Sequence, residues 1–61
     1  MKHVDFVRHL THHGCVLHRQ GARHEIYLNP ANGNRTAVPR HREIKDTTAR
    51  RICDQLGIPR P

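Results

Sequence analysis

The feature that most constrains the fold of this chain is an apolar stripe near its C-terminus. Its members recur at intervals of three and four residues: Ala49, Ile52, Cys53 and Leu56. This is the period of one face of an α-helix, so we predict a helix over about residues 46–56. Gly57 is placed to end this helix, because glycine readily adopts the left-handed conformation at a helix C-terminus. A helix with one apolar face must pack that face against another layer of structure.

A second stripe and three β-like segments supply that layer. Phe6, Val7 and Leu10 predict a helix over about residues 3–13. Strands are expected at residues 15–19, 24–28 and 35–38, separated by turns at 20–23 and 29–34. We therefore predict one small α+β domain over residues 1–61. It consists of a helix, a three-stranded antiparallel sheet and a second helix, with both helices on one face of the sheet and the other face open.

Positive charge dominates the chain. Eleven Lys and Arg residues stand against five Asp and Glu, giving a formal net charge of +6, and nine of the eleven cations are arginine. The planar guanidinium group binds phosphate through paired donors, where lysine offers a point charge. We interpret the charge as a surface for nucleic acid or for an acidic protein partner. The alternative is a solvated basic surface that only aids solubility.

Cysteine and histidine do not form a recognisable metal motif. Cys15 and Cys53 lie among apolar neighbours, so we interpret them as reduced core residues. His9 and His13 are one helical turn apart and could share a metal, but no acidic or cysteine ligand completes the set nearby. We predict no metal and no cofactor. Without an N-terminal signal sequence or a segment long enough to span a membrane, the protein is expected to be soluble and cytoplasmic.

Four segments of the chain follow the pattern of a known family. They are residues 3–15, 21–27, 38–44 and 48–58. The second segment places a histidine, His24, three residues before an aromatic, Tyr27. In this order and at these separations, the segments resemble the HicA-type toxins, the toxic half of bacterial type II toxin–antitoxin pairs. One departure is that Gly21 stands three residues before His24, where many members have a glycine two residues before the histidine.

The resemblance implies a fold like that of a double-stranded-RNA-binding domain, metal-independent endoribonuclease activity on messenger RNA, and a HicB-type antitoxin as partner. It also implies that His24 is the active-site histidine. RNA carries its own nucleophile, the 2′-hydroxyl, and a histidine with an ordinary pKa of about 6.5 can act as general base or acid in its cleavage. Arg19 and Arg23 could then hold the scissile phosphate and offset the charge that develops on it.

Further cations are candidates for contacts with RNA phosphates. Arg40, His41 and Arg42 precede the N-terminus of the last helix, a position that attracts phosphate. His41 is also a candidate for a second acid–base group, and the alternative for this segment is a solvated loop. Arg50, early in the last helix, could contact RNA or an acidic antitoxin surface, or could be an ordinary surface cation.

The sequence leaves two matters open. Alternation puts His24 on the same face of its strand as Ile26 and Leu28. If those two residues point into the core, His24 must lie at the rim of the sheet, while Tyr27 either stacks on a base or packs. The alternative functions are a non-catalytic RNA-binding module of the same fold and a protein-interaction module for an acidic partner.

Overall fold

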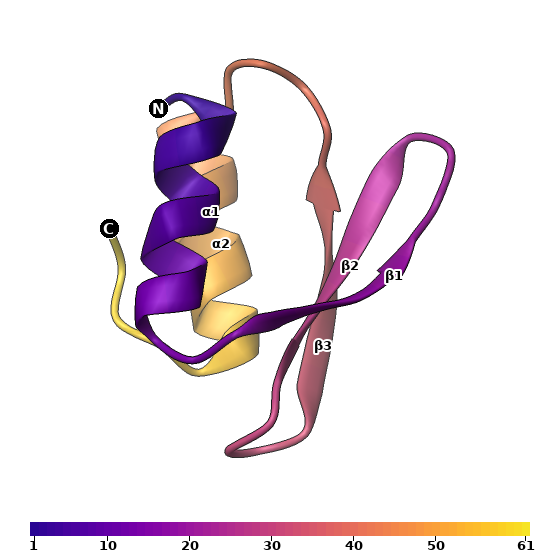
Figure 1. Ribbon diagram of the computed structural model, residues 1–61. Coiled ribbons are helices and arrows are strands. Elements are labelled where there is room, and N and C mark those ends of the chain that lie inside the picture. The colour runs from indigo at the N-terminus through magenta and orange to yellow at the C-terminus, as the bar shows by residue number, and fades with distance from the viewer.

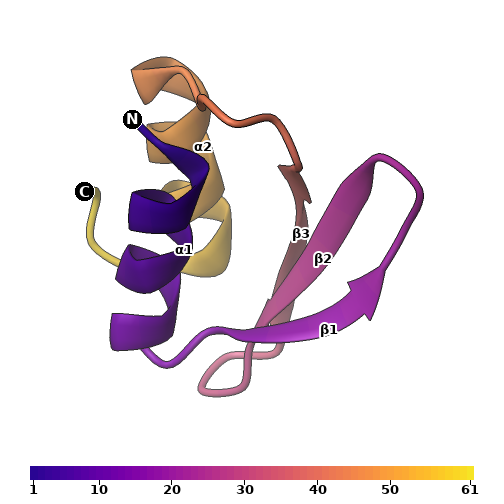
Figure 2. The same ribbon diagram turned by 45° about the horizontal axis from the view of Figure 1, so that its top comes forward.

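Two helices and a three-stranded sheet make up the computed structural model, which describes all 61 residues (Figure 1). The elements are α1 (His3–His12), β1 (Val16–Gln20), β2 (His24–Asn29), β3 (Asn34–Pro39) and α2 (Asp46–Leu56). Figures 1 and 2 show α1 and α2 side by side in one layer and the sheet in a second layer. The predicted α+β class and element order are confirmed, with boundaries shifted by no more than one residue.

The sheet is an antiparallel meander with the strand order β1-β2-β3. Pairing between β2 and β3 is continuous, from His24 opposite Pro39 to Asn29 opposite Asn34. Pairing between β1 and β2 is interrupted, because Leu17 lies opposite Tyr27 whereas Arg19 lies opposite Ile26. The extra residue between them is His18, so β1 contains a β-bulge.

The hydrophobic core lies between the helices and one face of the sheet. Ten apolar residues are buried there: Phe6, Leu10, Cys15, Tyr27, Val38, Ile44, Ala49, Ile52, Cys53 and Leu56. The four members of the C-terminal stripe are all among them, as the helical period predicted. Both cysteines are also free and buried, in agreement with the sequence interpretation. The two helices supply six of these residues, β2 and β3 supply one each, and the connecting segments supply Cys15 and Ile44, whereas every residue of β1 is exposed.

The structure decides which face of β2 is buried, a question that alternation along the strand left open. Tyr27 is the core residue of β2, with 6% of its surface exposed, and Asn29 is buried on the same face. Ile26, Leu28 and His24 alternate with them and therefore lie on the opposite, open face. The physical reason is the pairing with β3, where Tyr27 is opposite Thr36 on the side that contacts α2. Tyr27 is thus a packing residue.

The C-terminal end of α2 is tied to the turn between β2 and β3. Gly57 follows the helix with φ of 71°, as predicted for a glycine that ends a helix. The side-chain amides of Asn29 and Asn32 both donate to the Leu56 carbonyl oxygen, at 2.8 and 3.0 Å. These bonds satisfy a carbonyl that would otherwise lack a partner at the helix end. Neither helix has the length and apolar content needed to cross a membrane.

Candidate nucleic-acid interface

Negative charge is confined to the helix side of the molecule. Each carboxylate has a basic partner there: Asp5 with Arg8, Glu25 with His3, Glu43 and Asp46 with the N-terminal amine, and Asp54 with Arg60. Glu25 belongs to β2 but lies on the core face, where its oxygen is 3.1 Å from Nε2 of His3 in α1. The open face of the sheet therefore carries no carboxylate.

Most of the arginines have no carboxylate partner. Two of the nine, Arg8 and Arg60, form ion pairs. The other seven are Arg19, Arg23, Arg35, Arg40, Arg42, Arg50 and Arg51. A guanidinium group that is not neutralised within the protein keeps its donors available for an external phosphate. The fold therefore leaves seven arginines without a neutralising carboxylate, and these are distributed over several parts of the surface.

His24 begins β2 at the end of the sheet formed by the turn between β1 and β2. Its side chain is exposed on the open face and forms no hydrogen bond within the protein. Its backbone is held, because its carbonyl oxygen accepts a hydrogen bond from the Gly21 N–H at 2.8 Å. A Cβ atom at Gly21 would come within 3.0 Å of the same oxygen, so a glycine fits this close approach best. The fold therefore fixes the backbone of His24 and leaves its imidazole free.

Two of the sequence-predicted cations join His24 at this end of the sheet. Arg23 is its neighbour in the turn. Arg40 donates from Nη1 to the Gly21 carbonyl oxygen at 3.2 Å, and its backbone N–H donates to the Arg23 carbonyl oxygen at 3.4 Å. The structure thus brings together Arg23, His24 and Arg40 from two separate parts of the sequence.

The segment after β3 separates His41 from the arginines that flank it. Arg40 and Arg42 line a hollow of about 430 Å³ together with Lys2 at the start of the chain. His41 instead lines a different hollow of about 340 Å³, which also contains Arg51 of α2. The sequence treated these three neighbours as one cluster, and the structure places them on two surfaces.

Arg50 lies apart from the other predicted contacts. It lines a hollow of about 290 Å³ beside Met1, Asp46 and Pro61, in the helix layer. It therefore does not share a surface with His24 on the open face of the sheet. Among the predicted cations, Arg19 does share that face, since it pairs with Ile26, two residues from His24 along β2.

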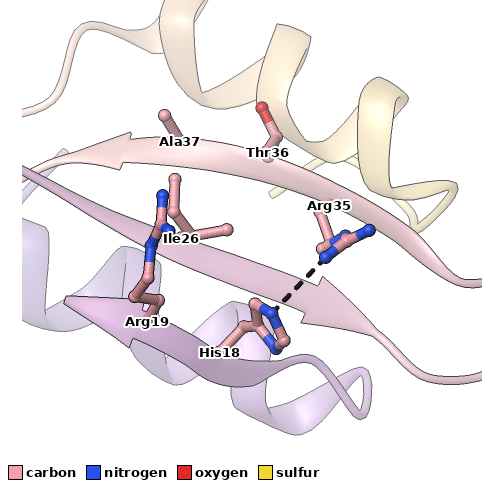
Figure 3. A pocket seen from close by; sticks show the side chains of 6 residues that line it. All are labelled: His18, Arg19, Ile26, Arg35, Thr36 and Ala37. Carbon is pink, nitrogen blue, oxygen red and sulfur yellow. Dashed lines mark hydrogen bonds between the residues drawn. The ribbon is translucent and has the colours of Figure 1, made fainter. Parts of the chain in front are cut away.

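Sequence reasoning missed two residues of the open face, His18 and Arg35. Together with Arg19, Ile26, Thr36 and Ala37 they line a hollow of about 270 Å³ (Figure 3). The bulge places His18 and Arg19 on the same face, whereas regular alternation would put them on opposite faces. The position of Arg35 could have been found from the Asn32-Gly33 turn signal, because that turn fixes the β2–β3 register. The bulge itself leaves no sequence signal that we can identify.

The histidines of α1 form a group of their own. The ring centroids of His9 and His13 are 4.6 Å apart, and those of His12 and His13 are 5.2 Å apart. Burial and the two neighbouring histidines lower the pKa of His13. His9 Nε2 is 2.7 Å from the Pro59 carbonyl oxygen, and no group of three potential metal ligands forms in the structure. These rings lie on the helix layer, away from the open face.

Comparison with known proteins identifies the family. The family model described as "HicA toxin of bacterial toxin-antitoxin" matches residues 4–58. The match places the chain among the toxins of bacterial toxin–antitoxin systems, a class in which an antitoxin is the partner. More particularly, the chain belongs to the HicA toxin family. No curated protein and no solved structure matches it.

Proposed function

We propose that this HicA-family toxin is a metal-independent endoribonuclease that cleaves messenger RNA with His24 as its general acid or base. The observation that carries the proposal is the position of His24. Its imidazole has no partner within the protein and lies on a sheet face that holds arginines and no carboxylate. This is also the residue that falls on the family's active-site histidine by resemblance.

Cleavage of the RNA chain forms one P–O bond and breaks another, and each change is accompanied by a proton transfer. The 2′-oxygen attacks the adjacent phosphorus, so the 2′-hydroxyl must lose its proton as the new P–O bond forms. The bond to the 5′-oxygen breaks, and that oxygen must gain a proton. An exposed histidine can carry out either transfer near neutral pH, and solvent water takes up or supplies the other proton. The products are a 2′,3′-cyclic phosphate and a free 5′-hydroxyl.

Arg23 and Arg40 are placed to bind the reacting phosphate. Arg23 lies in the same turn as His24, and Arg40 is anchored to that turn through the Gly21 and Arg23 carbonyl oxygens. Guanidinium donors fixed in position before the reaction stabilise the negative charge that builds up on the phosphate oxygens. Arg40 is anchored to backbone carbonyl oxygens of the protein, so its position does not depend on the bound RNA.

The same face is our candidate for the antitoxin. An antitoxin of the HicB type that covers His24 and its arginines would block access of RNA. A partner with an acidic surface would associate rapidly with this cationic face. Messenger RNA as substrate places the activity in the cytoplasm.

The test is cleavage of RNA by the purified chain in the presence of EDTA. We expect His24→Ala to reduce the rate by about 10²–10⁴-fold, the usual contribution of a general acid–base group. His12→Ala is the matched control, since it removes an exposed histidine from α1. We expect it to cleave at the wild-type rate.

Two outcomes would contradict the proposal. Undiminished cleavage by the His24→Ala protein would move the chemistry to another residue. RNA binding without cleavage by the wild-type chain would make the protein a binding module. Far-ultraviolet circular dichroism of each variant distinguishes loss of chemistry from loss of fold, and the exposed position of His24 predicts an unchanged spectrum.

A further inference from the structure

We infer that the hollow on the open face of the sheet is a nucleotide subsite, which binds one nucleotide of a single-stranded RNA beside His24. Its side chains come from all three strands: His18 and Arg19 from β1, Ile26 from β2, and Arg35 and Ala37 from β3 (Figure 3). The inference extends the proposed function, because it names the form of RNA and the residues that hold it. It rests on that function for the nature of the substrate.

The hollow is bounded by cations on two sides. Figure 3 shows the Arg19 side chain reaching from β1 along Ile26, and His18 and Arg35 pointing toward each other. Arg35 donates from Nη1 to His18 Nε2 at 3.4 Å, which is long for a hydrogen bond, and the Arg19 guanidinium has no partner in the protein. Both guanidinium groups therefore keep most of their donors free for one anion between them.

Because no carboxylate neutralises the arginines of the hollow, we expect the hollow to bind an anion, and phosphate is the anion that RNA supplies. All five carboxylates are paired on the helix side. Arg19 and Arg35 are exposed and border the same hollow, and a phosphate bound there would offset the positive charge of both. Planar guanidinium groups also match the paired oxygens of a phosphate.

The floor of the hollow is apolar. Ile26 and Ala37 lie directly opposite each other in neighbouring strands, on the open face. A volume of about 270 Å³ is just below the range of about 300–1,000 Å³ for ligand pockets, so it suits a single base and not a duplex. Phe6 and Tyr27 are in the core, so the planar groups that line the hollow and could stack on a base are the Arg19 guanidinium and the His18 imidazole.

The hollow and His24 lie on one continuous surface. Ile26 is two residues from His24 along β2, so their Cα atoms are about 7 Å apart at the usual rise of a strand. A single extended strand of RNA can thus occupy the hollow with one nucleotide and present a neighbouring phosphodiester to His24. In a duplex the bases face each other and are not available to fill such a hollow.

The experiment measures RNA binding in the His24→Ala protein, where the RNA stays intact if His24 is catalytic. The probe is a short fluorescent single-stranded RNA, compared with the same RNA annealed to its complement. We expect Arg19→Gln and Arg35→Gln each to weaken single-strand binding by about tenfold, the effect of losing one charge-assisted hydrogen bond. Each should also lower the salt dependence by about 0.7 in log–log slope.

The control is Arg8→Gln, which removes the same charge from α1, where Arg8 pairs with Asp5. We expect it to leave the dissociation constant and the salt dependence unchanged. Arg35→Lys is a second variant of the same position, and it should restore part of the affinity because charge returns without the planar group. The duplex should bind more weakly than the single strand and respond less to the two Gln variants.

Three results would overturn the subsite. The first is wild-type RNA affinity in the Arg19→Gln and Arg35→Gln proteins, and the second is preferential binding of the duplex. The third is loss of antitoxin binding in these variants while RNA binding is unchanged, which would assign the face to the protein partner. The two proposals can fail separately. The cleavage assay compares wild type with His24→Ala and tests the proposed function, whereas the binding assay with the two arginine variants tests only the nucleotide subsite.

Discussion

Asn29 joins two layers of the fold through its side chain, and its replacement by aspartate gives a sharp test of the structure. Asn29 is 5% exposed at the end of β2. Its Nδ2 donates to the Leu56 carbonyl oxygen at 2.8 Å, and its Oδ1 accepts from the Ala31 N–H at 3.1 Å. The Asn29→Asp change keeps the shape and the acceptor but replaces the donor with an oxygen.

The size of the effect depends on pH. An ionised carboxylate at this position cannot donate to Leu56, and it lies at the negative end of the α2 dipole. We expect a cost of about 2–3 kcal/mol at pH 7.5, the usual range for a buried group that loses its hydrogen bond. Asn32 still donates to the same carbonyl at 3.0 Å, which keeps the estimate at the lower end.

Protonation should restore the bond. Burial and the Leu56 carbonyl raise the pKa of the new carboxyl above its ordinary value of about 3.9. A raised folded-state pKa means that the stability is fully present below the unfolded value and is lost as the pH rises through the folded value. The stability difference between Asn29→Asp and wild type should therefore shrink as the pH falls toward 4, where the protonated carboxyl donates in place of the amide.

Urea unfolding followed by circular dichroism at pH 7.5 and at pH 4.5 measures both differences. A loss of about 2 kcal/mol corresponds to a fall of about 8–16 °C in melting temperature for a domain of this size. Asn29→Ala is the control, because it removes donor and acceptor together and its cost should not depend on pH. Equal stability of Asn29→Asp and wild type at pH 7.5, or a cost that is the same at both pH values, would refute the reasoning.

Three further predictions follow from the core and the helix end. Gly57→Ala should lower the urea midpoint by an amount corresponding to about 1–2 kcal/mol, because a non-glycine residue at φ of 71° is strained and its Cβ would lie 2.6 Å from Asn32 Nδ2. An unchanged midpoint would show that the turn can adjust. Phe6 is fully buried, so Phe6→Ala should cost about 3–5 kcal/mol, as much as the whole stability expected of so small a domain. Its circular dichroism at 25 °C should be that of a largely unfolded chain, and a cooperative native-like melt would contradict the assigned core. Burial raises the pKa of Cys53 to about 11, so the stability that this thiol contributes is complete below its unfolded value of about 8.5 and is lost as the pH rises through 11. Melting temperatures from pH 8 to 11 should fall less steeply in Cys53→Ala than in wild type, and identical slopes would contradict this.

Much of the fold could be predicted from local signals. The stripe of α2 and its end at Gly57 are properties of consecutive residues, since the helical period and the left-handed glycine need no information from distant parts of the chain. The same is true of the two turns that separate the strands. These signals predict the order of the helices and strands, because each signal depends only on residues within about ten positions of one another.

The facing of β2 could not be predicted in the same way. Alternation divides its residues into two sets, but both sets contain apolar side chains: Tyr27 in one, Ile26 and Leu28 in the other. Which set is buried depends on where the helices pack. The helices cover the Tyr27 side, because Val38 and Thr36 of β3 face α2 in the observed register. His24 consequently lies on the open face of the sheet.

The residues near His24 also differ in whether the sequence could predict their position. Arg23 was within reach of sequence reasoning because it adjoins the histidine. The approach of Arg40 was not, since it depends on hydrogen bonds to Gly21 and Arg23 across the sheet. The two surfaces that separate His41 from Arg40 and Arg42 were likewise invisible, because all three residues share one polar segment.

The sequence by itself determined the order of helices and strands, the members of the apolar stripe and the net positive charge. Only the tertiary structure decided where that charge would be uncompensated. The carboxylates come from five scattered positions, and packing brings three of them to basic groups from distant parts of the chain, as with Glu25 and His3. The β-bulge at His18 then places one more side chain on the open face of the sheet, where there is no carboxylate. The reason is physical: composition fixes how many charges a chain has, whereas electrostatic interaction depends on the distances between them, which only the fold sets.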